Sequence, residues 1–238
     1  MTTKTIKSVY WQGVRDAAPF ILVVVPFALL FGVVATEAGL KVIETMAFST
    51  MVFAGAAQFT ALQLLTENAP TAIALITALS VNLRMAMYSA ALTPHLGKAG
   101  LKQRVLAAFF MADQSYACSV LAFENNPDWS IDCKMAYFFG TITAISPFWC
   151  AFTLVGALVG TAIPASFALD FAVPITFLAM VAPMLRTAAH VAAALVSITV
   201  SLLFAFLPFS LGLIVAGFAG MMAGAQVELI ATRREADI

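Results

Sequence analysis

The chain has 238 residues, of which 62% are hydrophobic and only 10% are charged. An ordinary soluble domain has about half apolar and about a quarter charged residues, so this chain has too few polar side chains to cover a soluble surface. The composition excludes a soluble globular enzyme, a disordered chain, a nucleic-acid-binding protein and a disulfide scaffold, and it indicates an all-α polytopic membrane protein. The apolar runs are continuous, which also excludes a barrel whose strands alternate apolar and polar residues.

Apolar runs long enough to cross a bilayer follow one another along the chain. A membrane-spanning helix needs about 20 apolar residues. On this criterion the sequence predicts spans at 17–36, 44–65, 70–92, 104–123, 135–160, 168–184, 188–206 and 208–226. The last three runs are short or closely joined, so seven and eight spans remain alternatives, as do broken or re-entrant helices within them.

The segments outside the runs are short. Residues 1–16 are expected to form a cytoplasmic arm, 17–226 a single integral membrane transport domain, and 227–238 a cytoplasmic tail. Lys and Arg side chains near both ends place both termini on the cytoplasmic side, because cytoplasmic loops carry an excess of these residues. The distribution of Lys and Arg among the internal loops is compatible with both span counts.

Two pairs of similar segments indicate a weak internal repeat, for which chance similarity is the alternative. The pairs are Asp16-Ala-Ala-Pro19 with Pro26 against Asp170-Phe-Ala-Val-Pro174 with Pro183, and Ala54-Gly-Ala-Ala-Gln58 against Ala223-Gly-Ala-Gln226. Secondary transporters often contain such repeats and bind substrate where broken helices meet.

Arg84 and Asp113 are charged residues deep within predicted spans, in the runs 70–92 and 104–123. An ionisable side chain at the bilayer centre costs about 2.5–3.5 kcal/mol, so it usually has a partner or faces water. The opposite charges predict that the two residues neutralise each other across two helices or through a substrate. A fixed structural pair is the alternative, but Gly and Ala join helices at lower cost, which favours a functional role.

Further polar side chains surround Arg84. Tyr88 is four residues later and shares its helix face. Asn82 can line the same cavity only if the backbone is irregular, and the polar residues between Ser80 and Ser89 favour such a break. A regular helix, with Arg84 reaching toward one membrane surface, is the alternative.

Three more polar residues lie within or at the ends of the runs. Gln58 follows small residues that allow close backbone approach, and its amide either contacts a substrate or joins two helices. Asp16 and Asp170 open their runs, where a carboxylate either stabilises a helix N-terminus or belongs to a site.

Signatures of catalysis and of bound metal are absent from the sequence. The two histidines, His95 and His190, form no zinc motif, and there is neither a Gly-x-Ser-x-Gly turn nor a P-loop. We therefore expect no enzyme, no cofactor and no metal site. The cysteines, at 118, 133 and 150, are expected to be packing residues.

Several motifs together resemble the AzlC-type large subunits of branched-chain amino-acid exporters. They are Pro26-Phe27-x-x-x-Phe31-Gly32, Phe53-Ala-Gly-Ala-Ala-Gln58-Phe59, Asn82-Leu83-Arg84 followed by Tyr88-Ser89, the mid-span Asp113, and Leu169-Asp170-Phe171-x-x-Pro174-x-x-Phe177. Two positions depart from the family, which often has His where this chain has Met85 and Glu where it has Gln114. Both replacements remove a titratable group.

The resemblance implies secondary export of leucine, isoleucine and valine, with methionine as a further substrate, across a bacterial plasma (inner) membrane. It also implies a small AzlD-type membrane subunit as a partner. An amino acid needs a cation for its carboxylate and an anion or carbonyls for its ammonium group. We assign the carboxylate to Arg84, with Asn82, Gln58 and Tyr88 as further ligands. Asp113 is assigned either ammonium binding or the coupling proton.

Three residues are secondary candidates for the same site: Asp170, Asp16 and Gln114. Two other functions remain open. One is a non-transporting membrane scaffold or regulatory subunit, and the other is a channel whose flux does not depend on the proton gradient.

Overall fold

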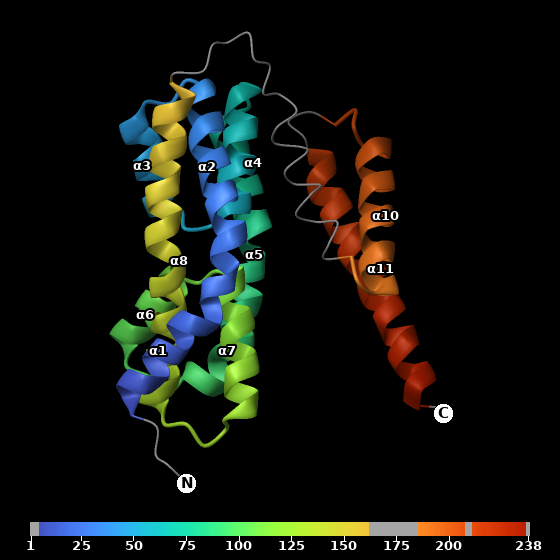
Figure 1. The fold of residues 1–238 in the computed structure, drawn as a ribbon. Helices are drawn as coiled ribbons and strands as arrows, with labels where there is room; N and C mark the ends of the chain where they lie inside the picture. Colours follow the sequence, from blue (N-terminus) through green and yellow to red (C-terminus); the bar gives the residue numbers. More distant parts are fainter. Residues whose placement is uncertain (1–4, 162–184, 208–210, 237–238) are drawn as a thin grey trace. The chain divides into compact units, whose positions relative to one another are not determined.

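The computed structural model describes residues 5–161, 185–207 and 211–236, and all regular elements in these residues are helices (Figure 1). The predicted all-α class is therefore confirmed for this part of the chain. The elements are α1 (Ile6–Ala17), the 3-10 turn η1 (Ala18–Phe20), α2 (Ile21–Glu37), α3 (Val42–Met51), α4 (Gly55–Thr66), α5 (Thr71–Leu96), α6 (Leu101–Phe109), α7 (Asp113–Asn125), α8 (Ile131–Gly160), α10 (Ala188–Leu203) and α11 (Leu211–Ala236).

Long apolar helices identify a multi-pass membrane protein. Within the described residues, four segments are long and apolar enough to cross a bilayer: Ile6–Glu37, Thr71–Leu96, Ile131–Gly160 and Leu211–Arg233. Helix α10 is apolar but shorter, at 16 residues. The run 168–184, with Asp170, lies outside the described residues. The alternative of seven or eight spans stays a prediction.

Two predicted spans are broken in the middle. The run 44–65 contains α3 and α4, separated by non-helical residues 52–54, where the Ala54 N–H donates to the Val52 carbonyl at 2.8 Å. The run 104–123 contains the end of α6 and all but the last residues of α7, separated at 110–112. At this second break the Ala112 N–H donates to the Ser115 hydroxyl at 2.9 Å. Neither run forms one continuous helix. Each is a broken helix, the alternative that the sequence analysis left open.

The break expected between Ser80 and Ser89 does not occur, because α5 is continuous from Thr71 to Leu96. Two of the polar side chains there find partners without it. The Ser80 hydroxyl donates to the Ile76 carbonyl one turn earlier at 2.9 Å, and Arg84 finds its partner on another helix.

Helix α8 is the centre of one compact unit, formed by residues 1–62 and 81–167. Helices α1, α2, α3, α6 and α7 all pack against it. Glycines bring the backbones together, since a Cβ would collide with backbone of the facing helix at each of Gly13, Gly32, Gly140 and Gly156. Small residues at such contacts are the usual means of packing helices within a bilayer. Residues 6–16, expected as an arm, thus form a helix packed on α8.

The second unit contains residues 63–80 and 168–238 and includes the helix pair α10 and α11. Helices α10 and α11 pack together, with the Ser197 hydroxyl donating to the Ala216 carbonyl at 3.1 Å. The segment 223–226, similar in sequence to 54–58, lies inside the continuous α11, whereas 54–58 begins at a helix break. The two segments therefore differ in structure, which favours the alternative of chance similarity for this pair. The other pair includes residues outside the described part.

Candidate functional site

The two helix breaks lie next to each other. Phe53, in the first break, has its ring centroid 5.8 Å from that of Phe110, in the second, and both breaks lie in the unit centred on α8. Helix α4 begins at Gly55 and α7 begins at Asp113, so the contact brings two helix N-termini into one region. The first N–H groups of a helix have no partner within it and carry partial positive charge. This region therefore favours an anionic group.

Arg84 and Asp113 form an ion pair across α5 and α7. The distance from Arg84 Nη1 to Asp113 Oδ2 is 3.2 Å, and the two side chains are 34% and 42% exposed. The predicted neutralisation across two helices is confirmed. This contact uses one nitrogen and one oxygen, while Arg84 Nε and Asp113 Oδ1 are buried without a hydrogen-bond partner. Each charged group thus has one hydrogen-bonding atom that the ion pair leaves unsatisfied.

Two tyrosines extend the ion pair on one side. The rings of Tyr88, on α5, and Tyr116, on α7, are stacked with centroids 4.1 Å apart and planes inclined by 12°. The Tyr88 side chain also interacts electrostatically with the Asp113 carboxylate. Tyr88 was predicted from its spacing to Arg84, whereas Tyr116 was not. The same reasoning would have found it, since it follows Asp113 by three residues and so lies on the same face of α7.

The other predicted ligands of this site occupy different positions. Asn82 lies two residues before Arg84, about 200° away around α5, and its side-chain oxygen is buried without a partner. Gln114 follows Asp113 in the first turn of α7 and is partly buried. Asp170 lies outside the described residues.

Gln58 connects the two sides of the first break. Its side chain is fully buried, and its amide nitrogen donates to the Val52 carbonyl and, at 3.4 Å, to the Ser49 carbonyl. The Gln58 side-chain oxygen has no partner. The amide therefore supports the end of α3, and substrate contact through its oxygen stays a prediction.

A buried polar network fixes α3 on α8 near this break. The Trp149 indole donates to the Ser49 hydroxyl at 2.8 Å, and this hydroxyl lies 3.2 Å from the hydroxyl of Thr153. Such hydrogen bonds between helices are the expected way to bury hydroxyl groups in a membrane protein. No sequence pattern predicts this network, because Ser and Thr are scattered throughout the apolar runs.

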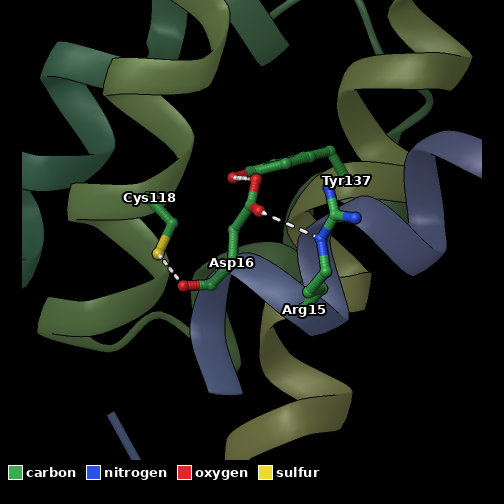
Figure 2. A network of polar contacts seen from close by, with 4 residues as sticks. All are labelled: Arg15, Asp16, Cys118 and Tyr137. Carbon is green, nitrogen blue, oxygen red and sulfur yellow. Dashed lines mark hydrogen bonds and ion pairs between the residues drawn. The ribbon is translucent and has the colours of Figure 1, made fainter. Parts of the chain in front are cut away.

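Asp16 belongs to a second polar cluster, shown in Figure 2. Its Oδ2 accepts a hydrogen bond from the Tyr137 hydroxyl at 2.9 Å, and its Oδ1 lies 4.0 Å from Arg15 Nε. The Cys118 thiol points to the Asp16 carbonyl oxygen at 3.8 Å. Of the two alternatives for Asp16, stabilisation of a helix N-terminus is excluded, because α1 begins at Ile6 and Asp16 lies in its last turn.

Within the described ranges, no three His, Cys, Asp or Glu side chains are grouped so that they could hold a metal ion. The cysteines at 118, 133 and 150 are free thiols.

The AzlC protein family model matches residues 19–163, a region that contains α2 to α8 and both helix breaks. The chain belongs to the AzlC family. It is 26% identical over 176 residues to the inner membrane protein YgaZ of Escherichia coli, covering 71% of this chain and 70% of YgaZ. It is 29% identical over 218 residues to an uncharacterized membrane protein of Archaeoglobus fulgidus, covering 90% of this chain and 93% of that relative. No solved structure matches the chain.

Proposed function

We propose that this AzlC-family protein is the large subunit of a secondary transporter that exports branched-chain amino acids, driven by the proton motive force. The supporting observation is the Arg84–Asp113 pair. It joins α5 to the N-terminus of α7, the helix that follows the second break. Opposite charges at membrane depth with unsatisfied hydrogen-bonding atoms suit a small zwitterion better than a fixed contact between helices.

An amino acid would bind by separating the two charges. Its carboxylate would form an ion pair with the guanidinium of Arg84, and its ammonium group would form an ion pair with the carboxylate of Asp113. The ion pair between Arg84 and Asp113 would thus be replaced by two ion pairs with the substrate. The helix N-termini at the adjoining breaks would add attraction for the substrate carboxylate. The rings of Phe53 and Phe110 offer an apolar surface for a branched side chain.

Asp113 is also the candidate for proton coupling. Met85 and Gln114 stand where relatives often have titratable side chains, so the carboxylate paired with Arg84 is the titratable group at hand. A membrane potential of 100 mV is worth about 2.3 kcal/mol per charge moved. One coupled proton would therefore sustain a gradient of about fiftyfold. A small AzlD-type membrane subunit completes the proposed exporter.

The test is counterflow of labelled leucine in proteoliposomes, with and without the small subunit. We expect exchange of leucine and valine, and net movement that a protonophore abolishes. The Asp113→Asn variant should insert into the membrane but not exchange. Asp128→Asn is the matched control, because Asp128 is an exposed carboxylate in the loop before α8.

The two other functions predict different results. A channel would pass leucine at a rate that the protonophore leaves unchanged. A scaffold would show no leucine movement with the small subunit present. Either result, or normal exchange by Asp113→Asn, would contradict the proposal.

A further inference from the structure

A cavity of about 360 Å³ lies beside the Asp16 cluster, among α1, η1, α7 and α8. This volume falls in the range of small-molecule sites, about 300–1,000 Å³. Its polar lining residues are Gln12, Asp16, Cys118, Asn125, Asn126 and Tyr137. Its apolar lining includes Phe20 and Leu121. The cavity thus combines hydrogen-bonding groups with surface for a hydrocarbon chain.

The charge of this cavity favours a cation. Asp16 is the one charged side chain among its lining residues. Arg15 is not part of the lining, is 82% exposed and lies 4.0 Å from the Asp16 carboxylate, a loose contact that solvent screens.

Oxygen atoms suited to an ammonium group belong to two of the residues that line the cavity, Asp16 and Asn126. Tyr137 donates to Oδ2 of Asp16, which leaves Oδ1 facing only the loose contact with Arg15. Asn126 donates its amide nitrogen to the Ala122 carbonyl at 2.9 Å, so its side-chain oxygen remains as an acceptor. A primary ammonium group has three N–H donors and no acceptor, which matches this set.

The cavity extends along α7 toward the Arg84–Asp113 pair. On α7 its lining begins at Ala117 and continues to Asn125, the last residue of the helix. Ala117 lies four residues after Asp113, about 6 Å along the helix axis, and Asn125 lies about 18 Å from it. The cavity therefore connects the loop end of α7 with a position one turn from Asp113.

We propose that this cavity is a second binding site, which takes the primary ammonium group of a small apolar amine or amino acid through Asp16 and Asn126. It serves as a vestibule to the Arg84–Asp113 pair. The vestibule role rests on the proposed transport function, whereas the binding of an ammonium group does not.

Cys118 provides a reporter inside the cavity. In a Cys133→Ala/Cys150→Ala variant it is the one remaining thiol, because the chain has three cysteines. The purified protein is treated with two thiosulfonate reagents of similar size, one carrying an ammonium group and one carrying a sulfonate. We expect the cationic reagent to react faster, and Asp16→Asn to lower the ratio of the two rates about tenfold, as the loss of a charge at close range implies.

Ligand protection identifies the occupant. Isoamylamine and leucine should slow modification of Cys118, and the acid of the same shape, 4-methylpentanoate, should not. Asp16→Asn should remove this protection, whereas the control Asp128→Asn should keep it. A neutral thiosulfonate that still modifies Cys118 at the parent rate would show that the Asp16→Asn variant is folded.

Four outcomes would overturn the inference: no reaction of Cys118, equal protection by the acid, no protection by the amine, or protection that persists in Asp16→Asn. Protection that depends on Asp113 and not on Asp16 would also overturn the inference, because it would place the ligand at the ion pair. If leucine counterflow fails but the amine still protects Cys118, the proposed transport and the vestibule role are contradicted. The ammonium site is then still supported. Intact counterflow without protection would remove the ammonium site alone.

Discussion

Neutralising Arg84 and Asp113 separately and together distinguishes a substrate-binding pair from a structural one. The variants are Arg84→Gln, Asp113→Asn and the double variant. Each single variant leaves one charge at membrane depth without its partner, which lies 3.2 Å away in the parent protein. The double variant leaves two neutral groups that can still hydrogen-bond to each other.

The size of the stability effect follows from the exposure of the pair. Removing one partner of a fully buried ion pair costs about 3–5 kcal/mol, whereas an exposed pair contributes about 0.2–1 kcal/mol. The side chains here are 34% and 42% exposed and share one contact. We therefore expect each single variant to lose about 1–2 kcal/mol of unfolding free energy and the double variant to recover most of it.

The effect on leucine should follow a different pattern. A hydrogen bond to a charged group is worth about 1.5–3 kcal/mol, so losing one ligand should weaken leucine binding by about 10- to 150-fold. The double variant lacks both ligands and should bind least. Thermal unfolding in detergent measures the first quantity, and leucine counterflow measures the second. Counterflow at the parent rate in the double variant would refute the reasoning, because the pair would then only join α5 and α7.

Two other substitutions test the site and the fold. Arg84→Lys keeps the charge but loses the planar fork, so leucine counterflow should fall at least about tenfold with the protein still in the membrane, and retained counterflow would favour a structural role. Gly156→Ala would place a Cβ 2.8 Å from the carbonyl carbon of Leu29, which forces α2 and α8 apart and should cost about 1–3 kcal/mol, measured as a lower thermal midpoint. Gly217→Ala is the control, because a Cβ there meets nothing within 4 Å and should gain up to about 1 kcal/mol of helix propensity. Equal midpoints for the two glycine variants would contradict the packing of α2 on α8.

The ion pair could be predicted from the sequence because its physical basis is local. A charge in an apolar run is costly wherever the run lies, and two opposite charges in neighbouring runs suggest their own pairing. Tyr88 follows from Arg84 by helix periodicity alone. None of these inferences requires knowledge of which helices pack together.

The helix breaks could not be located in the same way. Residues at both breaks are apolar, Phe53 and Phe110 among them, so hydropathy continues through each break without a change. Polar density indicated a break near Arg84 in α5, but the partner of Arg84 comes from α7 and leaves α5 intact. Polar residues thus indicated the position of the ion pair but the wrong helix for the break, because the charged side chain of α5 and the backbone irregularity belong to different segments.

Asp16 was placed wrongly for a related reason. Its apolar run was taken to begin at residue 17, which put the carboxylate at a helix start. The helix begins earlier, at Ile6, where the Thr5 hydroxyl accepts from the Ser8 N–H at 3.3 Å. Helix α1 is less apolar than the helices that follow, and its packing on α8 is a tertiary contact that hydropathy does not report.

The two carboxylates lead to different selectivities. At the ion pair, an amine without a carboxylate would separate Asp113 from Arg84 and leave the guanidinium unpaired, and an acid without an amine would leave Asp113 unpaired. A zwitterion would satisfy both charges, so the proposed binding at the pair would exclude simple amines and acids. Asp16 has no equivalent guanidinium in its cavity, so an ammonium group alone is sufficient there. Docking at Asp16 would therefore admit a broad set of amines, and selection for amino acids would occur only at the Arg84–Asp113 pair.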